Sequence, residues 1–82
     1  MSNPPKYLFT SAPMESIRIV VNGEERPAAP GLSLLEVLRW LALEPSRVAV
    51  ELNREIVQRE KWAATPVLDG ARLEIVQFVG GG

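Results

Sequence analysis

Residues 16–23 read Ser16-Ile17-Arg18-Ile19-Val20-Val21-Asn22-Gly23. Ile17, Ile19 and Val21 occupy alternate positions among other apolar or long side chains, which indicates a strand with one buried face. Asn22-Gly23 is the strongest two-residue signal for a hairpin, because both residues tolerate the positive φ angles that such a turn requires. The stretch therefore predicts the first strand of a sheet with a tight turn after it.

A short edge strand and a helix are predicted after the turn. Glu24 to about Ala28 is polar and contains a proline, which suits the edge of a sheet. Ser33 and Glu36 have the spacing of a capping box, in which each side chain accepts a hydrogen bond from a backbone N–H group. The apolar stripe that follows at helical spacing consists of Leu34, Val37, Leu38 and Leu41. We expect about three turns, from Leu34 to Ala42, with Trp40 off the stripe and half exposed.

The second half of the chain predicts three more strands. They are expected at Val48 to Leu52, at Glu55 to Val57 and at Arg72 to Phe78. Their inward-facing residues are Val48, Val50, Leu52, Leu73 and Ile75. Turns are expected at Asn53-Arg54 and Asp69-Gly70. Arg59 to Trp62 is expected to form a single helical turn, with Trp62 covering one end of the core.

This order of elements is typical of the α+β class, in which a small mixed sheet wraps around one helix. The topology that fits it is the β-grasp fold, with the first and last strands adjacent and parallel at the sheet centre. We expect residues 16–82 to form this domain, with a flexible glycine tail at residues 78–82. Residues 1–15 contain three prolines and two serines. We expect them to form a flexible extension, or to dock on the domain or a partner through Tyr7 to Phe9.

Composition excludes several kinds of functional site. The chain has 82 residues, a net charge of −1 and neither cysteine nor histidine. Disulfides, thiolate nucleophiles and cysteine-ligated iron–sulfur clusters are therefore excluded, and the most common general base near neutral pH is missing. The basic residues are scattered, unlike those of a nucleic-acid-binding protein, and no apolar run approaches the roughly 18 residues that span a bilayer. We expect an intracellular protein whose reactive group is not a side chain.

The end of the last predicted strand departs from its own pattern. An inward-facing apolar residue is expected at position 77, where the sequence has Gln77. Val76, Phe78 and Val79 are apolar and belong to the opposite face or lie beyond the sheet. Two interpretations stay open. The segment forms a bulge or a small second cluster, or these three residues form an exposed apolar surface that binds a partner protein.

Three glycines, Gly80, Gly81 and Gly82, end the sequence and direct attention to the terminal carboxylate. An α-carboxyl group has a reference pKa of about 3.3–3.7, so at neutral pH it is ionised and able to attack the α-phosphate of a nucleotide. Three extended residues reach about 10 Å, and without Cβ atoms they fit a narrow channel in another protein. We therefore expect Gly82 to be modified, with Gly80 and Gly81 as its tether. The alternative is a glycine end without a role.

Four stretches of the sequence resemble the ThiS family of sulfur carrier proteins. They are Ile19 to Gly23, Gly31 to Leu38, Ala49 to Trp62 and Asp69 to Gly82. The resemblance covers about Ser16 to the C-terminus and includes the terminal Gly81-Gly82. The family pattern Asn-x-x-hydrophobic-Val-Pro-Arg appears at Asn53 to Arg59, with Gln58 in place of proline. This departure falls in a loop and bears little on function.

The resemblance implies a cytoplasmic, ubiquitin-like carrier rather than an enzyme. A ThiF-like adenylyltransferase, using ATP and magnesium, would adenylate the carboxylate of Gly82. Sulfur from a cysteine desulfurase persulfide would convert this group to a thiocarboxylate. The thiazole synthase ThiG would then take the sulfur into the thiazole ring of the thiamin precursor. The carrier itself would have no catalytic residue, would bind no cofactor or metal, and would need neither nucleic acid nor membrane.

Other assignments stay open at this point. A related carrier for molybdopterin synthesis or tRNA thiolation shares the Gly-Gly end, and the stretch Asn53 to Trp62 favours the ThiS family over it. A ubiquitin-like modifier joined to lysines would use the same activated end. A β-grasp module that binds RNA or metabolites would show a basic or aromatic patch. The β-grasp ferredoxins are excluded because they need cysteine ligands.

Overall fold

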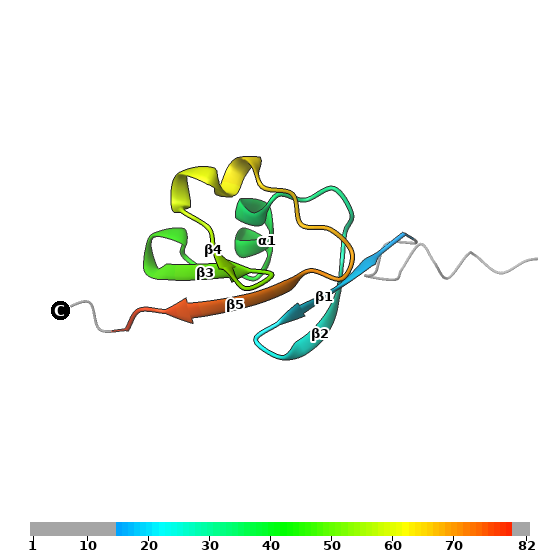
Figure 1. Cartoon of the computed structure of the whole chain (residues 1–82), viewed down its shortest axis with the longest axis horizontal. Coiled ribbons are helices and arrows are strands. Elements are labelled where there is room, and N and C mark those ends of the chain that lie inside the picture. The colour runs from blue at the N-terminus through cyan, green and yellow to red at the C-terminus, as the bar shows by residue number, and fades with distance from the viewer. Residues whose placement is uncertain (1–14, 80–82) are drawn as a thin grey trace, which may run out of the picture.

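The computed structural model describes residues 15–79, which form one mixed five-stranded sheet and one helix (Figure 1). The strands are β1 (Ile17–Val21), β2 (Glu24–Ala28), β3 (Val48–Leu52), β4 (Glu55–Ile56) and β5 (Arg72–Gln77). Their order across the sheet is β2-β1-β5-β3-β4, with β1 parallel to β5 and all other neighbours antiparallel. The predicted α+β class, the β-grasp arrangement and the central pairing of first and last strands are confirmed. Residues 1–14 of the expected extension and the tail residues 80–82 lie outside the described residues.

The helix α1 (Leu34–Trp40) begins as the capping box predicts and ends earlier than expected. The backbone N–H of Glu36 donates to Ser33 Oγ at 3.1 Å, and the Ser33 N–H donates to Glu36 Oε1 at 2.8 Å. The prediction of a helix to Ala42 is wrong by two residues. Ala42 has a φ of +63°, and the N–H of Leu43 donates to the carbonyl of Leu38 at 3.0 Å. This left-handed C-terminal motif closes the helix after two turns.

Replacing Ala42 with glycine is expected to stabilise the fold by roughly 1 kcal/mol, because a Cβ atom disfavours the left-handed conformation found there. Urea unfolding followed by circular dichroism measures the change. Ala63 is the control, because it is not among the residues with positive φ and glycine there is expected to destabilise. Equal destabilisation by both glycines would contradict this account of the helix end.

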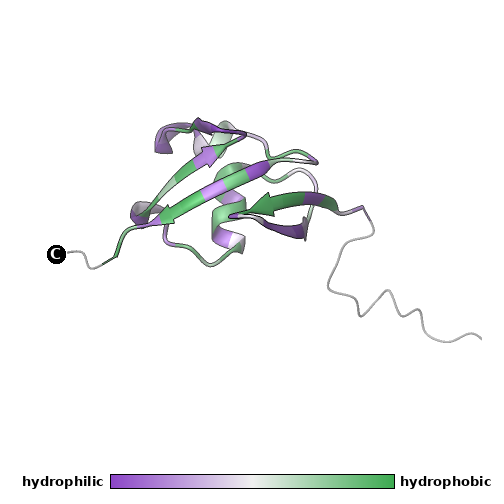
Figure 2. Cartoon of the chain, turned by 60° about the horizontal axis from the view of Figure 1, so that its bottom comes forward, coloured by the Kyte–Doolittle hydropathy of each residue, from purple (hydrophilic) through white to green (hydrophobic). Residues whose placement is uncertain are grey.

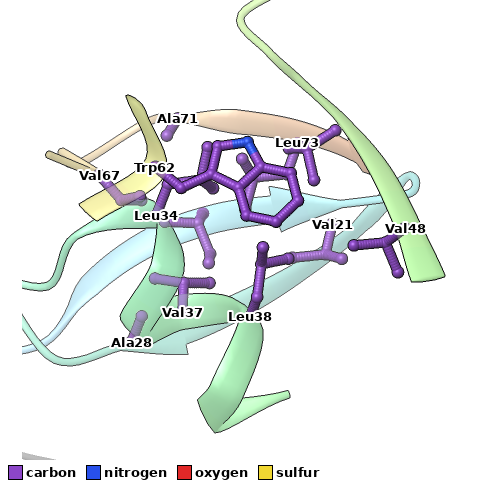
Figure 3. Packing of buried hydrophobic residues seen from close by; sticks show 12 residues of the cluster. Val21, Ala28, Leu34, Val37, Leu38, Val48, Trp62, Val67, Ala71 and Leu73 are labelled. Atoms are coloured by element: carbon purple, nitrogen blue, oxygen red, sulfur yellow. The ribbon is translucent and has the colours of Figure 1, made fainter. Parts of the chain in front are cut away.

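The core lies between α1 and the inner face of the sheet, and Trp62 is its largest side chain (Figure 3). Trp62 lies in η3 (Arg59–Ala64), a 3₁₀ helix that runs two residues beyond the helical turn predicted there. Its indole N–H donates to the carbonyl of Val57 at 2.8 Å. A second 3₁₀ helix, η2 (Pro45–Arg47), was not predicted and connects the end of α1 to β3. The predicted inward residues of β1, β3 and β5 all belong to the core or pack against it.

The turn predictions hold as well. Asn22, Gly23, Asn53, Arg54 and Gly70 all have positive φ angles. Trp40 is half exposed, as expected from its place outside the apolar stripe. Among residues 15–79, no helix has the length and apolar character needed to cross a membrane.

Candidate functional site

The candidate site is the C-terminal end of β5, where the chain leaves the sheet (Figure 1). β1 pairs with β5 only as far as Val21 opposite Leu73, whereas β3 continues alongside β5 to Gln77. Beyond the strand, the N–H of Phe78 still donates to the carbonyl of Arg47 at 2.7 Å. The backbone is therefore held as far as Phe78. The predicted site of modification, Gly82, and its tether of Gly80 and Gly81 lie outside the described residues.

Two turn asparagines hold β5 in register with side-chain hydrogen bonds. Beyond the end of β1, the Ile75 N–H donates to Asn22 Oδ1 at 2.7 Å and Asn22 Nδ2 donates to the Ile75 carbonyl at 3.2 Å. The side chain of Asn22 thus adds one rung to the ladder after the strand itself has ended. At the other end of β5, the Arg72 N–H donates to Asn53 Oδ1 at 2.9 Å. The sequence predicted these asparagines only as turn residues.

Replacing Asn22 with glycine is expected to loosen the end of β5 while the turn is kept. Glycine accepts the positive φ of this position, so the main loss is the pair of hydrogen bonds to Ile75, worth about 1–2 kcal/mol together. Amide hydrogen exchange at Ile75, measured by NMR, should accelerate. Asn53→Gly is the matched control, because it should accelerate exchange at Arg72 and leave Ile75 protected. Unchanged exchange at Ile75 in Asn22→Gly would rule out this holding role.

The apolar residues predicted at the end of β5 are exposed. Val76, Phe78 and Val79 have exposed fractions of 60%, 53% and 89%. β5 pairs with β3 residue for residue up to Gln77, so the alternative of a bulge is not found. Figure 2 shows hydrophobic and hydrophilic residues alternating along β5, with hydrophobic residues again where the chain leaves the sheet. Exposure matches the second interpretation, and binding of a partner by these residues stays a prediction.

Ile56 of β4 belongs to the same region and was missed by the sequence reasoning. It is 72% exposed, and together with Phe78 it lines a hollow of about 360 Å³ beside β3. A two-residue strand shows no alternation, so the sequence gives no signal for the face on which Ile56 lies. Ile56 pairs with Glu51 of β3, so its side chain lies on the outer face of the sheet, away from α1.

Gln77, the polar residue at an inward position, lies at the rim of a separate hollow of about 190 Å³. The other lining residues are Val21, Asn22, Arg26, Leu41, Leu43 and Ile75. At this point β5 has passed the end of β1. A polar side chain is tolerated because the position is exposed to solvent rather than enclosed.

The polar and charged side chains of residues 15–79 lie at the surface or are only partly buried. Within residues 15–79, no polar or charged residue is buried, and no three His, Cys, Asp or Glu side chains gather in one place. What the arrangement does provide is a hydrogen-bonded strand that ends in an exposed apolar segment.

Comparison with known proteins gives consistent matches over the same part of the chain. The family model described as "ThiS family" matches residues 19–82. The sulfur carrier protein ThiS of Escherichia coli is 32% identical over 66 residues, which cover 80% of this chain and 100% of that protein. A thiazole synthase of Paramagnetospirillum magneticum is 42% identical over 66 residues, which are 80% of this chain and 20% of that enzyme. This chain therefore spans about a fifth of that relative's length.

A solved structure supports the fold over the same range. The crystal structure of the thiamine biosynthesis protein ThiS from Geobacter metallireducens has a TM-score of 0.69 and 36% sequence identity. The match covers 80% of this chain and 100% of that one.

Proposed function

The chain belongs to the ThiS family, and from this premise we propose that it is a sulfur carrier protein of thiamin biosynthesis. The observation that carries the proposal is the extent of the family match, which runs from residue 19 to residue 82. It includes the Gly81-Gly82 end as well as the folded domain. The full-length coverage of the Escherichia coli sulfur carrier supports the same assignment.

The proposed reaction converts the carboxylate of Gly82 in three steps. A carboxylate oxygen attacks the α-phosphorus of ATP in a ThiF-like adenylyltransferase, and magnesium pyrophosphate leaves. A persulfide sulfur then attacks the acyl carbon, and AMP leaves as the carbon–oxygen bond breaks. A thiol then attacks the outer sulfur of the resulting acyl disulfide and the S–S bond breaks. The sulfur on Gly82 is reduced to a thiocarboxylate, and the thiol is oxidised as it joins the outer sulfur in a new disulfide. No side chain of the carrier takes part in these steps.

The contribution of the fold is to hold the strand from which the chain end extends. Asn22 and the carbonyl of Arg47 hold β5 as far as Phe78, and Val79 is almost fully exposed. Because the backbone is already ordered as far as Phe78, binding of the chain end to a partner does not have to order these residues. Because glycine has no Cβ atom, the three glycines that follow in the sequence suit a narrow channel in a partner protein.

The acceptor of the sulfur is proposed to be a thiazole synthase. The Paramagnetospirillum magneticum enzyme contains a segment 42% identical to this chain. A carrier-like segment within a thiazole synthase supports a direct encounter between the two kinds of protein. The cysteine desulfurase is proposed only as the indirect source of the persulfide.

Adenylation is tested by ATP–pyrophosphate exchange. Labelled pyrophosphate should enter ATP when the chain is mixed with a ThiF-like adenylyltransferase and magnesium, and the rate should depend on the concentration of the carrier. Absence of carrier-dependent exchange with several active adenylyltransferases would contradict the proposed function.

Phe78→Ala is expected to raise the KM for the carrier in this assay about tenfold or more, because a half-exposed aromatic side chain at an interface is a frequent binding hot spot. The free energy of unfolding should change by less than about 1 kcal/mol, as is usual for an exposed position. Leu68→Ala is the matched control. Leu68 is 66% exposed, compared with 53% for Phe78, and precedes β5 at its opposite end, so neither quantity should change much. Equal losses of binding and stability would identify Phe78 as a core residue.

A further inference from the structure

A hollow of about 210 Å³ lies against the loop that leads into β5. Its apolar lining comes from Leu52, Pro66, Leu68 and Ala71, and its polar lining includes Asn53 and Asp69. Leu68 is 66% exposed, so a large apolar side chain faces water here. The exposed residues Val76, Phe78 and Val79 come at the other end of β5. Leu68 therefore belongs to a separate apolar surface.

The chain enters the sheet directly beside this hollow. Because β1 runs parallel to β5, the start of β1 and the loop before β5 lie at the same end of the sheet (Figure 1). The backbone N–H of Arg18 donates to Asp69 Oδ1 at 2.8 Å, and the N–H of Gly70 donates to the carbonyl of Arg18 at 2.7 Å. Asp69 and Gly70 both line the hollow. Ser16 is thus only two residues from a position that is hydrogen-bonded to the wall of the hollow.

The stretch before the described residues is long enough to reach this hollow. Residues 1–14 precede the described part of the chain, and the ThiS family match begins at residue 19. Tyr7 and Phe9 are the only aromatic residues of this stretch, with Leu8 between them. Six residues separate Phe9 from Ser16, and an extended chain of that length spans about 20 Å.

The chemistry of residues 6–9 matches the lining of the hollow. Tyrosine has an apolar ring and a polar tip, which suits a surface where Leu68 is followed directly by Asp69. In the part of the chain that the structure describes, Asp69 forms no ion pair within 4 Å, and Lys6 carries the only charged side chain of residues 1–14. A short tether also gives the segment an effective concentration on the order of millimolar at the hollow. The tether favours this occupant over a second copy or another protein.

We propose that residues 6–9 bind in this hollow of their own chain, with Tyr7 and Phe9 covering Leu68. Covering this side chain removes exposed apolar surface from water, which is favourable. The inference goes beyond the proposed function, because it assigns a role to residues that the family match does not include. Binding there leaves Phe78 exposed, since the hollow and Phe78 lie at opposite ends of β5.

The triple variant Tyr7→Ala/Leu8→Ala/Phe9→Ala tests this binding in the full chain. In the wild type, the ring currents of Tyr7 and Phe9 should displace the methyl NMR signals of Leu68, and the variant should lose this displacement. Amide hydrogen exchange at Gly70 should become about threefold faster or more, because a bound segment suppresses opening of the loop in proportion to its occupancy.

Two further variants serve as controls on either side of the contact. Ser2→Ala/Asn3→Ala/Ser11→Ala changes three polar residues of the same stretch and should alter neither measurement. Leu68→Ala changes the hollow instead of the segment. In this variant the ring signals of Tyr7, the only tyrosine of the chain, should move to their positions in the urea-unfolded protein.

The possible results decide between occupants of the hollow. Leu68 methyl signals that are identical in the wild type and the triple variant would overturn the proposal, as would an equal change in the polar control. A displacement that grows with protein concentration would assign the hollow to a second copy of the chain and contradict binding within one chain. Displaced signals at Ile56 in place of Leu68 would put the segment on the outer face of the sheet and also overturn the proposal. The proposal predicts a concentration-independent displacement at Leu68 that only the triple variant and Leu68→Ala disturb.

Discussion

A chain extended by one alanine after Gly82 is expected to lose sulfur acceptance by at least about 10²-fold while its fold stays unchanged. The added residue moves the terminal carboxylate by about 3.3–3.6 Å, and a misplacement of 1 Å can reduce a rate by this factor. It also introduces a Cβ atom into a segment that otherwise has none. Pyrophosphate exchange and thiocarboxylate formation are the two measurements.

The control for this extension is the same alanine inserted after Met1, at the other end of the chain. This variant has the same composition and should retain full activity. Circular dichroism and urea unfolding of both variants should match the wild type, because both alanines are added outside residues 15–79, which contain the sheet, the helix and the core. Full acceptance of sulfur by the C-terminally extended chain would show that the terminus is not the reacting group.

Trp62→Ala is expected to destabilise the domain by about 3–5 kcal/mol, the range typical of large aromatic side chains removed from a core. Trp62 is 2% exposed, and its loss also leaves the carbonyl of Val57 without its hydrogen bond. Since small domains are commonly stable by only about 5–15 kcal/mol, the variant should unfold at much lower urea concentration or be largely unfolded. Circular dichroism is the suitable signal, because the substitution removes a fluorophore.

Trp40→Ala is the matched control for this substitution. Trp40 is 48% exposed and lies at the end of α1, so its replacement should change stability by less than about 1 kcal/mol. Trp62→Phe should fall between the two, because it keeps most of the apolar volume and removes only the indole N–H donor. Equal effects of Trp40→Ala and Trp62→Ala would contradict the central place of Trp62 in the core.

Local signals in the sequence predicted most of the fold. The alternation from Ile17 to Val21, the turn at Asn22-Gly23 and the capping box at Ser33 each act over a few residues, and each is confirmed. The end of α1 was predicted wrongly because its signal is weak. The residue with left-handed backbone conformation after the helix is Ala42. Glycine is the usual residue at this position, and a glycine there would have predicted the end of the helix.

The candidate site was predicted in part. Polar Gln77 and the apolar residues around it indicated an exposed end, and Val76, Phe78 and Val79 are exposed. The hydrogen bond from the Ile75 N–H to the Asn22 side chain joins residues that are 53 positions apart, so no local sequence pattern predicts it. The hydrogen bond between Arg18 and Asp69 likewise depends on strand register, which a list of strands does not fix. The role of Gly82 stays a prediction, because it lies outside the described residues.

The most direct test of the central claim is the mass of the carrier after incubation with a ThiF-like adenylyltransferase, ATP, magnesium, a cysteine desulfurase with cysteine, and a thiol. Intact-protein mass spectrometry should show a gain equal to the exchange of one oxygen for one sulfur, and fragmentation should place it on Gly82. Omission of ATP should abolish the gain. An unchanged mass with partners that are active on another carrier, or a gain placed elsewhere in the chain, would contradict the proposed function.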